Sequence, residues 1–300
     1  MTINFSTSTG FFLWRPACWL RVTGEDAGAF LQGQFTNDLR ALASTRAVYG
    51  LWLTVKGKVL ADSFVLAGGS PQEFWVGSYF SPAAEVRERL ESHVIADDVV
   101  VADETENWAG LCVQGEAANA LLAEAPRGTP VFPGRRHRGP AVEWMYPLAA
   151  GEPAWVGALQ ASGRLIEGEE RERLRIASGI PAVPADIGPN DLPNEGGLEI
   201  DAISYTKGCY LGQEVMARLK SMGQVRRRLV RVRGAGTEPP ACPAPVFTAA
   251  RQVGELRSAA RDGAGGWIGL ALVSILQVGS AAALALAAGA PPALQLEEAP

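Results

Sequence analysis

The chain has 300 residues, of which 47% are apolar and 20% charged. This composition is average for a soluble globular protein and excludes disordered, collagen-like and coiled-coil classes. The net charge of −5 gives no general attraction to nucleic acid or to an anionic membrane, so DNA is not expected as a partner. Four widely spaced cysteines and the absence of an initial basic stretch followed by an apolar run predict a reduced, cytoplasmic protein.

Strands and helices alternate through the first half of the chain. An N-cap threonine, Thr23, predicts a helix after a strand at 18–22, and Ser81-Pro82 begins a helix on which Val86, Leu90 and Val94 recur on one face. The other predicted elements are a hairpin of strands 49–55 and 59–66, a strand at 104–114, a helix at 115–125 and a short strand at 142–145. The basic residues 135–138 are expected in an exposed, mobile connection.

The second half changes from a helix to short β-rich runs. A helix is predicted at 167–178, with acidic residues at its start and Gly179 after its end. Prolines then predict an irregular segment. The later strand-like runs are 226–233, 245–247, 254–256, 267–273, 281–287 and 293–297. They predict a small β-barrel or sandwich from about residue 225 onward.

An uncharged run from Gly263 to Leu296 allows one other interpretation. Residues 267–289 are long enough to cross a bilayer, but glycine, glutamine and serine interrupt them and no basic cluster flanks them. We therefore expect no membrane span. Two buried strands around a Gly279-Ser280 turn, with another turn at Pro291-Pro292, are the preferred interpretation.

The sequence lacks the residue patterns that several kinds of chemistry require. The chain has only two histidines, no Cys-x-x-Cys, and no cluster with zinc or iron–sulfur spacing, so no metal site is expected. Gly57-Lys58 is not followed by Ser or Thr, and no Gly-x-Gly-x-x-Gly follows a strand. Nucleotide and dinucleotide cradles are therefore excluded.

Residues 205–214, YTKGCYLGQE, form the densest group of chemically useful side chains. Lys207 precedes Cys209 by two residues, two glycines permit close backbone approach, and a helix is predicted from Gly212 to Leu219. A lysine and a helix N-terminus would both stabilise a thiolate relative to the ordinary thiol pKa near 8.5. Cys209 is thus a candidate reactive thiol. The alternative is a buried cysteine beside glycines that only shape a turn.

The octapeptide KGCYLGQE resembles the signature Lys-Gly-Cys-Tyr-x-Gly-Gln-Glu of the YgfZ family of folate-binding proteins, and all seven specified positions match. Arg218 lies where the family tends to place an arginine. Further segments follow in the family's order: VTGEDAGAFLQGQFTNDL at 22–39, KGKVLAD at 56–62, RIASGIP at 175–181 and LPNEGGLE at 192–199. Motifs therefore cover residues 20–225, and the C-terminal part resembles the family by position only.

The resemblance implies a tetrahydrofolate-binding protein similar to the aminomethyltransferase (T protein) of the glycine cleavage system. The strand matching 59–62 carries paired acids in that relative, whereas this chain has Ala61-Asp62. Glu195 matches a folate-contacting glutamate, and a carboxylate can accept the two parallel donors of a pterin. Asn37, Asp62, Tyr205 and Arg175 are weaker candidates for the same cleft. The remaining motif positions are expected to support the site: Gly208, Tyr210, Gly212, Gln213, Glu214 and Arg218.

Three of the folate candidates have a structural alternative. Glu195 would instead cap a turn, Arg175 would form an ion pair on a helix face, and Asp62 would be solvated at a strand end. Five arginines at 226–233 would put Arg227, Arg231 and Arg233 on one face of a strand. That face could hold a polyglutamate tail or an acidic partner, or it could be a solvated edge strand, with an RNA contact ranked third.

The resemblance implies a role in the assembly or repair of iron–sulfur enzymes, which makes these enzymes or their assembly machinery the expected partners. Cys209 would be the functional thiol, with Lys207 tuning it. One alternative is a folate-dependent aminomethyl or one-carbon transferase, against which the single acid Asp62 argues, and another is a binding scaffold without chemistry. The expected fold is α+β, with two interleaved α/β lobes at residues 1–225 and a C-terminal β-barrel domain at 226–300.

Overall fold

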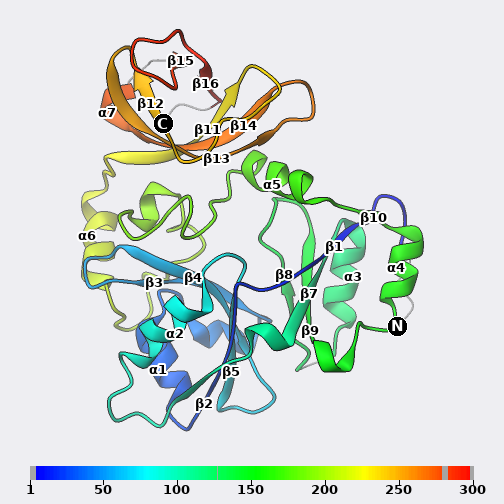
Figure 1. Cartoon of the computed structure of the whole chain (residues 1–300). Coiled ribbons are helices and arrows are strands. Elements are labelled where there is room, and N and C mark those ends of the chain that lie inside the picture. Colours follow the sequence, from blue (N-terminus) through cyan, green and yellow to red (C-terminus); the bar gives the residue numbers. More distant parts are fainter. Residues whose placement is uncertain (1–4, 127, 279–282, 298–300) are drawn as a thin grey trace. The chain divides into compact units, whose positions relative to one another are not determined.

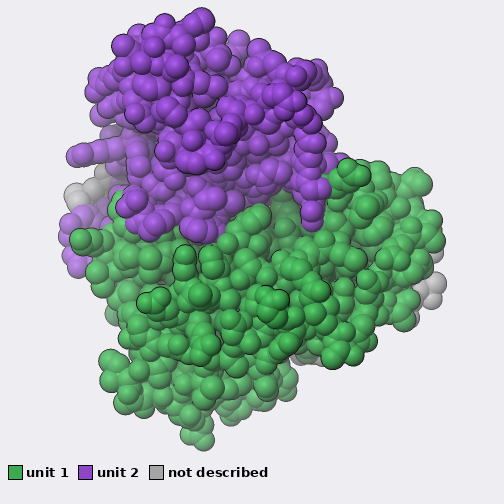
Figure 2. Space-filling view, viewed as in Figure 1, with its two compact units in different colours: residues 1–167, 201–213 green, residues 168–200, 214–300 purple. Residues whose placement is uncertain are grey.

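The chain folds into two compact units, each made of two segments of sequence (Figure 2). The first unit is Met1–Glu167 with Asp201–Gln213, and the second is Gly168–Ile200 with Glu214–Pro300. The computed structural model describes residues 5–126, 128–278 and 283–297. The two compact units do not test the predicted division into a domain at 1–225 and a domain at 226–300, which stays a prediction.

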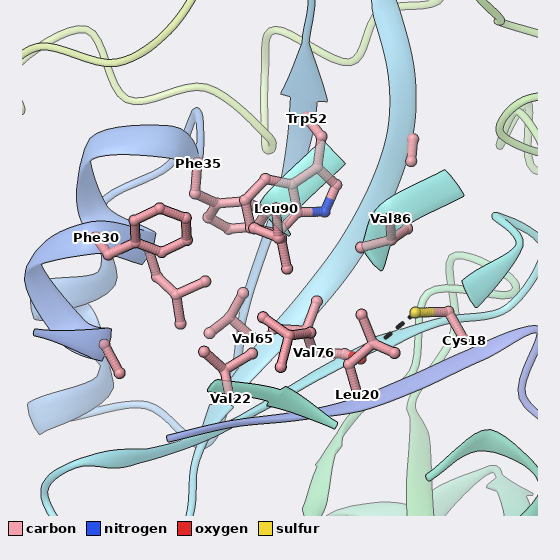
Figure 3. Close-up of a cluster of buried hydrophobic side chains, with 14 of the residues drawn as sticks. Cys18, Leu20, Val22, Phe30, Phe35, Trp52, Val65, Val76, Val86 and Leu90 are labelled. Atoms are coloured by element: carbon pink, nitrogen blue, oxygen red, sulfur yellow. Dashed lines mark hydrogen bonds between the residues drawn. The ribbon is translucent and has the colours of Figure 1, made fainter. Parts of the chain in front are cut away.

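One five-stranded sheet of the first unit is antiparallel throughout and has the order β3-β4-β5-β2-β6. Its strands are β2 (Cys18–Thr23), β3 (Val48–Leu53), β4 (Val59–Ala67), β5 (Glu73–Ser78) and β6 (Val100–Asp103). Helices α1 (Ala27–Gln34) and α2 (Ala83–Glu91) contribute Phe30, Val86 and Leu90 to a core shared with the strands (Figure 3). Phe35, just after α1, packs on Trp52 of β3 with ring centroids 4.8 Å apart.

The other sheet of the first unit has the order β10-β1-β7-β9-β8, in which only β1 and β10 pair in parallel. Its strands are β1 (Gly10–Trp14), β7 (Trp108–Gln114), β8 (Val131–Pro133), β9 (Ala141–Pro147) and β10 (Arg164–Leu165), with helices α3 (Glu116–Glu124) and α4 (Val156–Ser162) (Figure 1). A cluster rich in aromatic rings joins the two sheets: Trp19 and Phe64 come from one, and Phe132 and Met145 from the other.

The second unit contains a six-stranded antiparallel sheet of order β12-β13-β14-β11-β16-β15. Its strands are β11 (Arg227–Gly234), β12 (Ala244–Thr248), β13 (Arg251–Arg261), β14 (Trp267–Ser274), β15 (Ala283–Leu284) and β16 (Leu294–Leu296). A bridge between Phe247 and Ala285 connects the two ends of this sheet, so it forms a nearly closed barrel. The unit also holds α5 (Gly168–Ala177), α7 (Ile275–Val278) and all but the first residue of α6 (Gln213–Met222).

The predicted α+β class with a C-terminal barrel is confirmed, with local differences. The strand expected at 104–114 starts at Trp108, because Thr105–Asn107 forms a 3₁₀ turn, η2. Val94 lies beyond the end of α2. Single 3₁₀ turns also occur at Leu39–Ala43 (η1), Leu148–Ala150 (η3) and Pro193–Glu195 (η4).

The uncharged C-terminal run contains β14, a short helix, α7, and the strands β15 and β16. The predicted Gly279-Ser280 turn lies outside the described residues. In the described parts of the chain, no helix combines the length and the apolar character that crossing a membrane requires.

Candidate functional site

The motif loop, residues 201–213, belongs to the first unit and is held against the residues that follow α1. Thr36 donates its hydroxyl to the carbonyl oxygen of Ala202 at 2.7 Å, and its own carbonyl oxygen accepts from the amide of Ser204 at 3.0 Å. The Asn37 side chain donates to the carbonyl oxygen of Asp201 at 2.9 Å. The start of the motif loop is therefore fixed by hydrogen bonds to Thr36 and Asn37.

Lys207 and Tyr210, which flank Gly208 and Cys209, are both buried, with exposed fractions of 5% and 6%. The ammonium of Lys207 lies 5.4 Å from the centroid of the Tyr210 ring. It also donates to the carbonyl oxygens of Gln32, Phe35 and Asn37 at 2.6, 2.6 and 2.9 Å. These carbonyls lie at and just beyond the C-terminus of α1, where unpaired carbonyl oxygens and the helix dipole favour a cation.

Burial changes the titration of both flanking residues. It lowers the pKa of Lys207 to about 8, an effect that the charge of Asp38 opposes. It raises the pKa of Tyr210 to about 12, and among the described residues the Tyr210 hydroxyl has no hydrogen-bond partner. A buried ammonium beside neutral carbonyls is thus easier to deprotonate than an ordinary lysine.

Cys209 is exposed, and all four cysteines of the chain are free thiols. Cys18 and Cys112 are buried, and burial raises the pKa of each. Cys242 is exposed as a residue, but burial of its sulfur, with the charges of Asp186 and Glu172, raises its pKa to about 11. Cys209 therefore lies at the surface, on a loop whose start is fixed by hydrogen bonds. The alternative of a buried cysteine is wrong.

Lys207 was expected next to the Cys209 thiol, and its observed contacts differ from that expectation. Among the described residues, no hydrogen bond or ion pair joins the Lys207 ammonium to Cys209. The spacing of two residues had suggested proximity of the side chains. Instead, Lys207 turns toward the end of α1. The tuning role expected for it stays a prediction.

The two motif glycines have different surroundings. Gly212 has a φ of +86°, and a Cβ atom there would lie 2.8 Å from the carbonyl oxygen of Thr54 in the β3–β4 hairpin. Gly208 has open space where a Cβ would be. Close backbone approach is therefore confirmed for Gly212 only.

The later motif residues start α6. The amide of Gln213 donates to the carbonyl oxygen of Tyr210 at 3.2 Å. Glu214 and Arg218 form an exposed ion pair of 3.0 Å one turn apart. This pair supports the helix, and such exposed pairs contribute little to stability. Tyr205 is half-buried.

Asp62 is the centre of a buried polar cluster on β4, with an exposed fraction of 5%. One carboxylate oxygen accepts from the hydroxyls of Ser78 and Ser81 at 2.6 and 2.7 Å, and the other from Tyr49 at 3.0 Å. Burial raises the pKa of Asp62, although these three hydrogen bonds oppose the shift. The alternative of a solvated acid at a strand end is wrong, because Asp62 lies within β4.

Tyr49 links Asp62 to the motif loop. Asn37 donates to the Tyr49 carbonyl oxygen at 2.8 Å, and the Arg135 guanidinium lies 4.3 Å from the Tyr49 ring centroid. Arg135 also pairs with Asp201 at 2.8 Å. The structure thus brings together two predicted residues, Asn37 and Asp62, and three that the sequence analysis missed. Tyr49 could have been found, because it pairs across the hairpin with Phe64, two positions from Asp62 and on the same face.

Arg135 and Arg136 are partly buried, unlike the exposed connection that was expected at 135–138, whereas Arg138 is exposed and the expected mobility stays a prediction. Arg136 pairs with the buried Glu143 at 2.9 Å, and its guanidinium lies 3.8 Å from the Tyr79 ring centroid and 4.4 Å from that of Trp14. Aromatic faces attract guanidinium groups, which explains why Arg135 and Arg136 fold inward.

Glu195 belongs to the second unit and is buried in η4. Its carboxylate accepts from the Leu192 amide at 2.7 Å and from Arg227 at 2.8 and 2.9 Å. Arg227 also pairs with Asp191 at 2.9 Å. These contacts match the turn-capping alternative, and the folate contact of Glu195 stays a prediction.

Arg175, also in the second unit, is the hub of a buried network. Its guanidinium donates to Asp186 at 2.6 Å, to Ser258 at 2.9 Å and to Glu172. This geometry matches the ion-pair alternative. Asp186 is fully buried and was not singled out from the sequence; it also bonds to Ser258, 72 residues away.

The arginine-rich strand is β11, and it lies between β14 and β16, so the expected edge strand is wrong. Val230 and Val232 face the barrel core. On the opposite face, Arg227 holds the 191–195 turn, Arg231 donates to the carbonyl oxygen of Ala177 at 2.8 Å, and Arg233 pairs with Asp262 at 2.9 Å. These arginines have partners within their own unit.

Among the described residues, no group of three or more His, Cys, Asp or Glu side chains is arranged to hold a metal ion.

Comparison with known proteins relates the chain to one group. Residues 13–131 match the GCVT N-terminal domain. The chain is 31% identical over 274 residues to the iron-sulfur cluster assembly factor IBA57, mitochondrial, of Mus musculus, covering 85% of this chain and 74% of that protein. It is 30% identical over 239 residues to the tRNA-modifying protein YgfZ of Edwardsiella ictaluri (strain 93-146), covering 76% and 71%.

The fold has a solved counterpart. The glycine cleavage system aminomethyltransferase T from Bartonella henselae superposes with a TM-score of 0.80 at 17% identity, covering 98% of this chain and 86% of that one. This likeness establishes the aminomethyltransferase-like fold. The identity to the mouse and Edwardsiella relatives, over more than two thirds of each chain, shows that this chain belongs to the family of YgfZ and IBA57.

Proposed function

We propose that this protein is a folate-binding accessory factor that supports the assembly or repair of iron–sulfur enzymes, with Cys209 as its functional thiol. The observation that carries the proposal is the exposure of Cys209 between two buried residues, Lys207 and Tyr210. A thiol held at the surface of an ordered loop is available to a partner protein or its cluster. The names of the relatives, an iron-sulfur cluster assembly factor and a tRNA-modifying protein, support this role.

Asp62 is a candidate acceptor for a pterin, although Ser78, Ser81 and Tyr49 already donate to its buried carboxylate. Asp62 is a carboxylate next to the aromatic ring of Tyr49, and a pterin offers paired donors and a flat face. A bound reduced folate would supply a carrier for a one-carbon unit. The residues of this chain would hold it by accepting its donors and stacking on its ring. Glu195 remains a second candidate acceptor, although Arg227 already binds its carboxylate.

Titration calorimetry with tetrahydrofolate tests the ligand. We expect Glu195→Gln to weaken binding by about 1.5–3 kcal/mol, the range for a charge-assisted hydrogen bond. Glu238→Gln, at an exposed carboxylate in the same unit, is the control. An affinity within a factor of two of the parent would remove Glu195 from the site.

A test in cells addresses the thiol. In cells that lack their own family member, Cys209→Ser should leave the protein folded and abolish its support of iron–sulfur enzymes, whereas Cys242→Ser should not. Full activity of the Cys209→Ser variant would reject the functional thiol and favour a binding scaffold without chemistry.

A folate-dependent aminomethyl transferase is the enzymatic alternative. Ala61 is buried in the core beside α1 and α2, so Asp62 has no acidic neighbour at that position. The absence of turnover with an aminomethyl-lipoyl carrier protein would distinguish the accessory role from this transferase.

Partners and location remain proposals. We propose iron–sulfur enzymes or their assembly machinery as partners. RNA contact by the arginine-rich strand is not favoured, because Arg227, Arg231 and Arg233 are paired within the chain. The cytoplasmic location stays a prediction, since the mouse relative is named as mitochondrial.

A further inference from the structure

The Lys207 ammonium has a complete set of partners that lie far away in the sequence. Its three hydrogens match three carbonyl oxygens, those of Gln32, Phe35 and Asn37, at 2.6 to 2.9 Å. These residues are 170 to 175 positions before Lys207. The side chain is almost fully enclosed, so the ammonium is held in one place.

The same stretch of chain also holds the start of the motif loop. Thr36 bonds to Ala202 and Ser204, and Asn37 bonds to Asp201. Phe35 is fully buried in the core against Trp52 (Figure 3), which makes the carbonyl at this position part of a rigid support. The three hydrogen bonds of Lys207 are therefore the last, along the motif loop, of several that attach this loop to the end of α1.

Cys209 follows two residues after this attachment and precedes the buried Tyr210. Gly208 between Lys207 and Cys209 has open space around it and no side chain of its own to pack. The position of the thiol thus depends on the buried residue on either side of the Gly208-Cys209 pair.

We propose that Lys207 is a positioning residue: it fixes the motif loop on the C-terminal carbonyls of α1 and so determines where Cys209 is presented, without stabilising the thiolate by its charge. The importance of Cys209 rests on the proposed function above. The effect of Lys207 on the motif loop does not depend on that function.

Hydrogen exchange and alkylation separate positioning from electrostatic tuning. Lys207→Met keeps the aliphatic stem and removes the donors, and Lys56→Met makes the same charge change at an exposed lysine of the β3–β4 hairpin. We expect amide exchange in peptides covering 202–210 to become roughly tenfold or more faster in Lys207→Met, since hydrogen bonds to a charged group are lost. We expect the pH midpoint of Cys209 alkylation in Lys207→Met to equal the midpoint in Lys56→Met.

Two results would overturn the proposal. One is unchanged exchange in 202–210 for Lys207→Met. The other is a pH midpoint of alkylation that moves upward relative to Lys56→Met, because that shift is the mark of a lysine acting through its charge.

Further variants keep the test decisive. Leu121→Ala, in the α3 core, controls for general destabilisation. Amide exchange in 202–210 should not become faster in this variant as it does in Lys207→Met. If Lys207→Met does not fold, Lys207→Arg replaces it: a planar guanidinium cannot direct three donors to one tripod of carbonyls, so 202–210 should still exchange faster than in the parent. Parent-like exchange in Lys207→Arg would count against the proposal.

The failure of this inference and of the proposed function can be told apart. Full support of iron–sulfur enzymes by Cys209→Ser would reject the functional thiol and leave the exchange result valid. Loss of support by Cys209→Ser together with normal loop exchange in Lys207→Met would reject positioning alone.

Discussion

Lys207 in the first unit and Arg175 in the second are both almost fully buried, with exposed fractions of 5% and 3%. Each holds a loop in place, but their partners differ. Lys207 faces three neutral carbonyl oxygens, whereas Arg175 faces the carboxylates of Asp186 and Glu172.

This difference in partners determines how readily each side chain loses its charge. Burial lowers the pKa of Lys207 to about 8, and the hydrogen-bond acceptors of its ammonium among the described residues are backbone carbonyl oxygens. Burial also disfavours the charge on Arg175, but Glu172 and Asp186 outweigh that effect and raise the pKa of Arg175. The Arg175 guanidinium therefore keeps its charge at neutral pH and holds its network together. The Lys207 ammonium loses its proton more readily than an ordinary lysine, and its loop carries the exposed thiol of Cys209.

The largest expected effect comes from breaking the second-unit network. Asp186→Ala leaves the Arg175 guanidinium buried with only the partly exposed Glu172 as a charged partner. We expect a loss of about 3–5 kcal/mol in unfolding free energy, the cost of orphaning one partner of a buried pair. Denaturant unfolding measures it, with Glu214→Ala in an exposed pair as the control. A loss below about 1 kcal/mol would show that the network is dispensable.

Removing the charge of Asp62 should separate binding from stability. Because burial raises its pKa, the native state holds the proton more tightly than the unfolded state, and this carboxyl lowers stability as pH rises from about 4 through its raised pKa. Asp62→Asn should therefore raise the melting temperature at neutral pH.

The same variant should bind tetrahydrofolate roughly tenfold to a hundredfold more weakly, because a charge-assisted acceptor is lost. Calorimetry and thermal unfolding from about pH 4 to about pH 7 check the two effects. A lower melting temperature together with unchanged affinity would make Asp62 a purely structural acid.

The two motif glycines offer a matched pair within the first unit. Gly212→Ala should cost about 1–3 kcal/mol, since it forces a side chain into positive φ and into contact with Thr54. Gly208→Ala should cost less than about 0.5 kcal/mol, because its surroundings are open. Denaturant unfolding of the two variants measures this difference in stability. Equal costs would mean that the motif loop does not pack on the hairpin as described.

The smallest change in the protein is alkylation of a single thiol. Cys209 should react with iodoacetamide at neutral pH faster than Cys18, Cys112 or Cys242, because two of these are buried and the third has a pKa of about 11. Mass spectrometry of peptides after short labelling gives the rates. Equal labelling of all four cysteines in the folded protein would contradict the special status of Cys209.

Local patterns were sufficient for much of the architecture. The helix after Ser81-Pro82 forms as α2, because its apolar residues recur at helical spacing. The hairpin around Gly57 forms as β3 and β4, because two β-rich runs are joined by a short turn with a positive-φ glycine. In such cases the residues that decide the structure are close in sequence, and the sequence alone is informative.

The candidate site shows where local patterns stop being sufficient. The motif at 207–214 identified an unusual cysteine, and its exposure agrees with a functional thiol. The partners of its neighbour Lys207 are about 170 residues away, and the carbonyl groups that bind it carry no side-chain signature. Tyr49, Arg135 and Asp201 likewise meet only because the first unit brings distant segments together.

By itself, then, the sequence determined the α+β class and the barrel-forming strands and singled out Cys209 as the candidate thiol, because periodicity, turn chemistry and a specific octapeptide are local properties. Tertiary structure alone decided that Lys207 binds carbonyls, that β11 is a central strand, and that Arg175 and Glu195 are engaged by partners in the second unit. Buried charges take whatever partner the fold places within reach, and desolvation makes that choice obligatory. The partner of a charge is therefore a property of the folded chain.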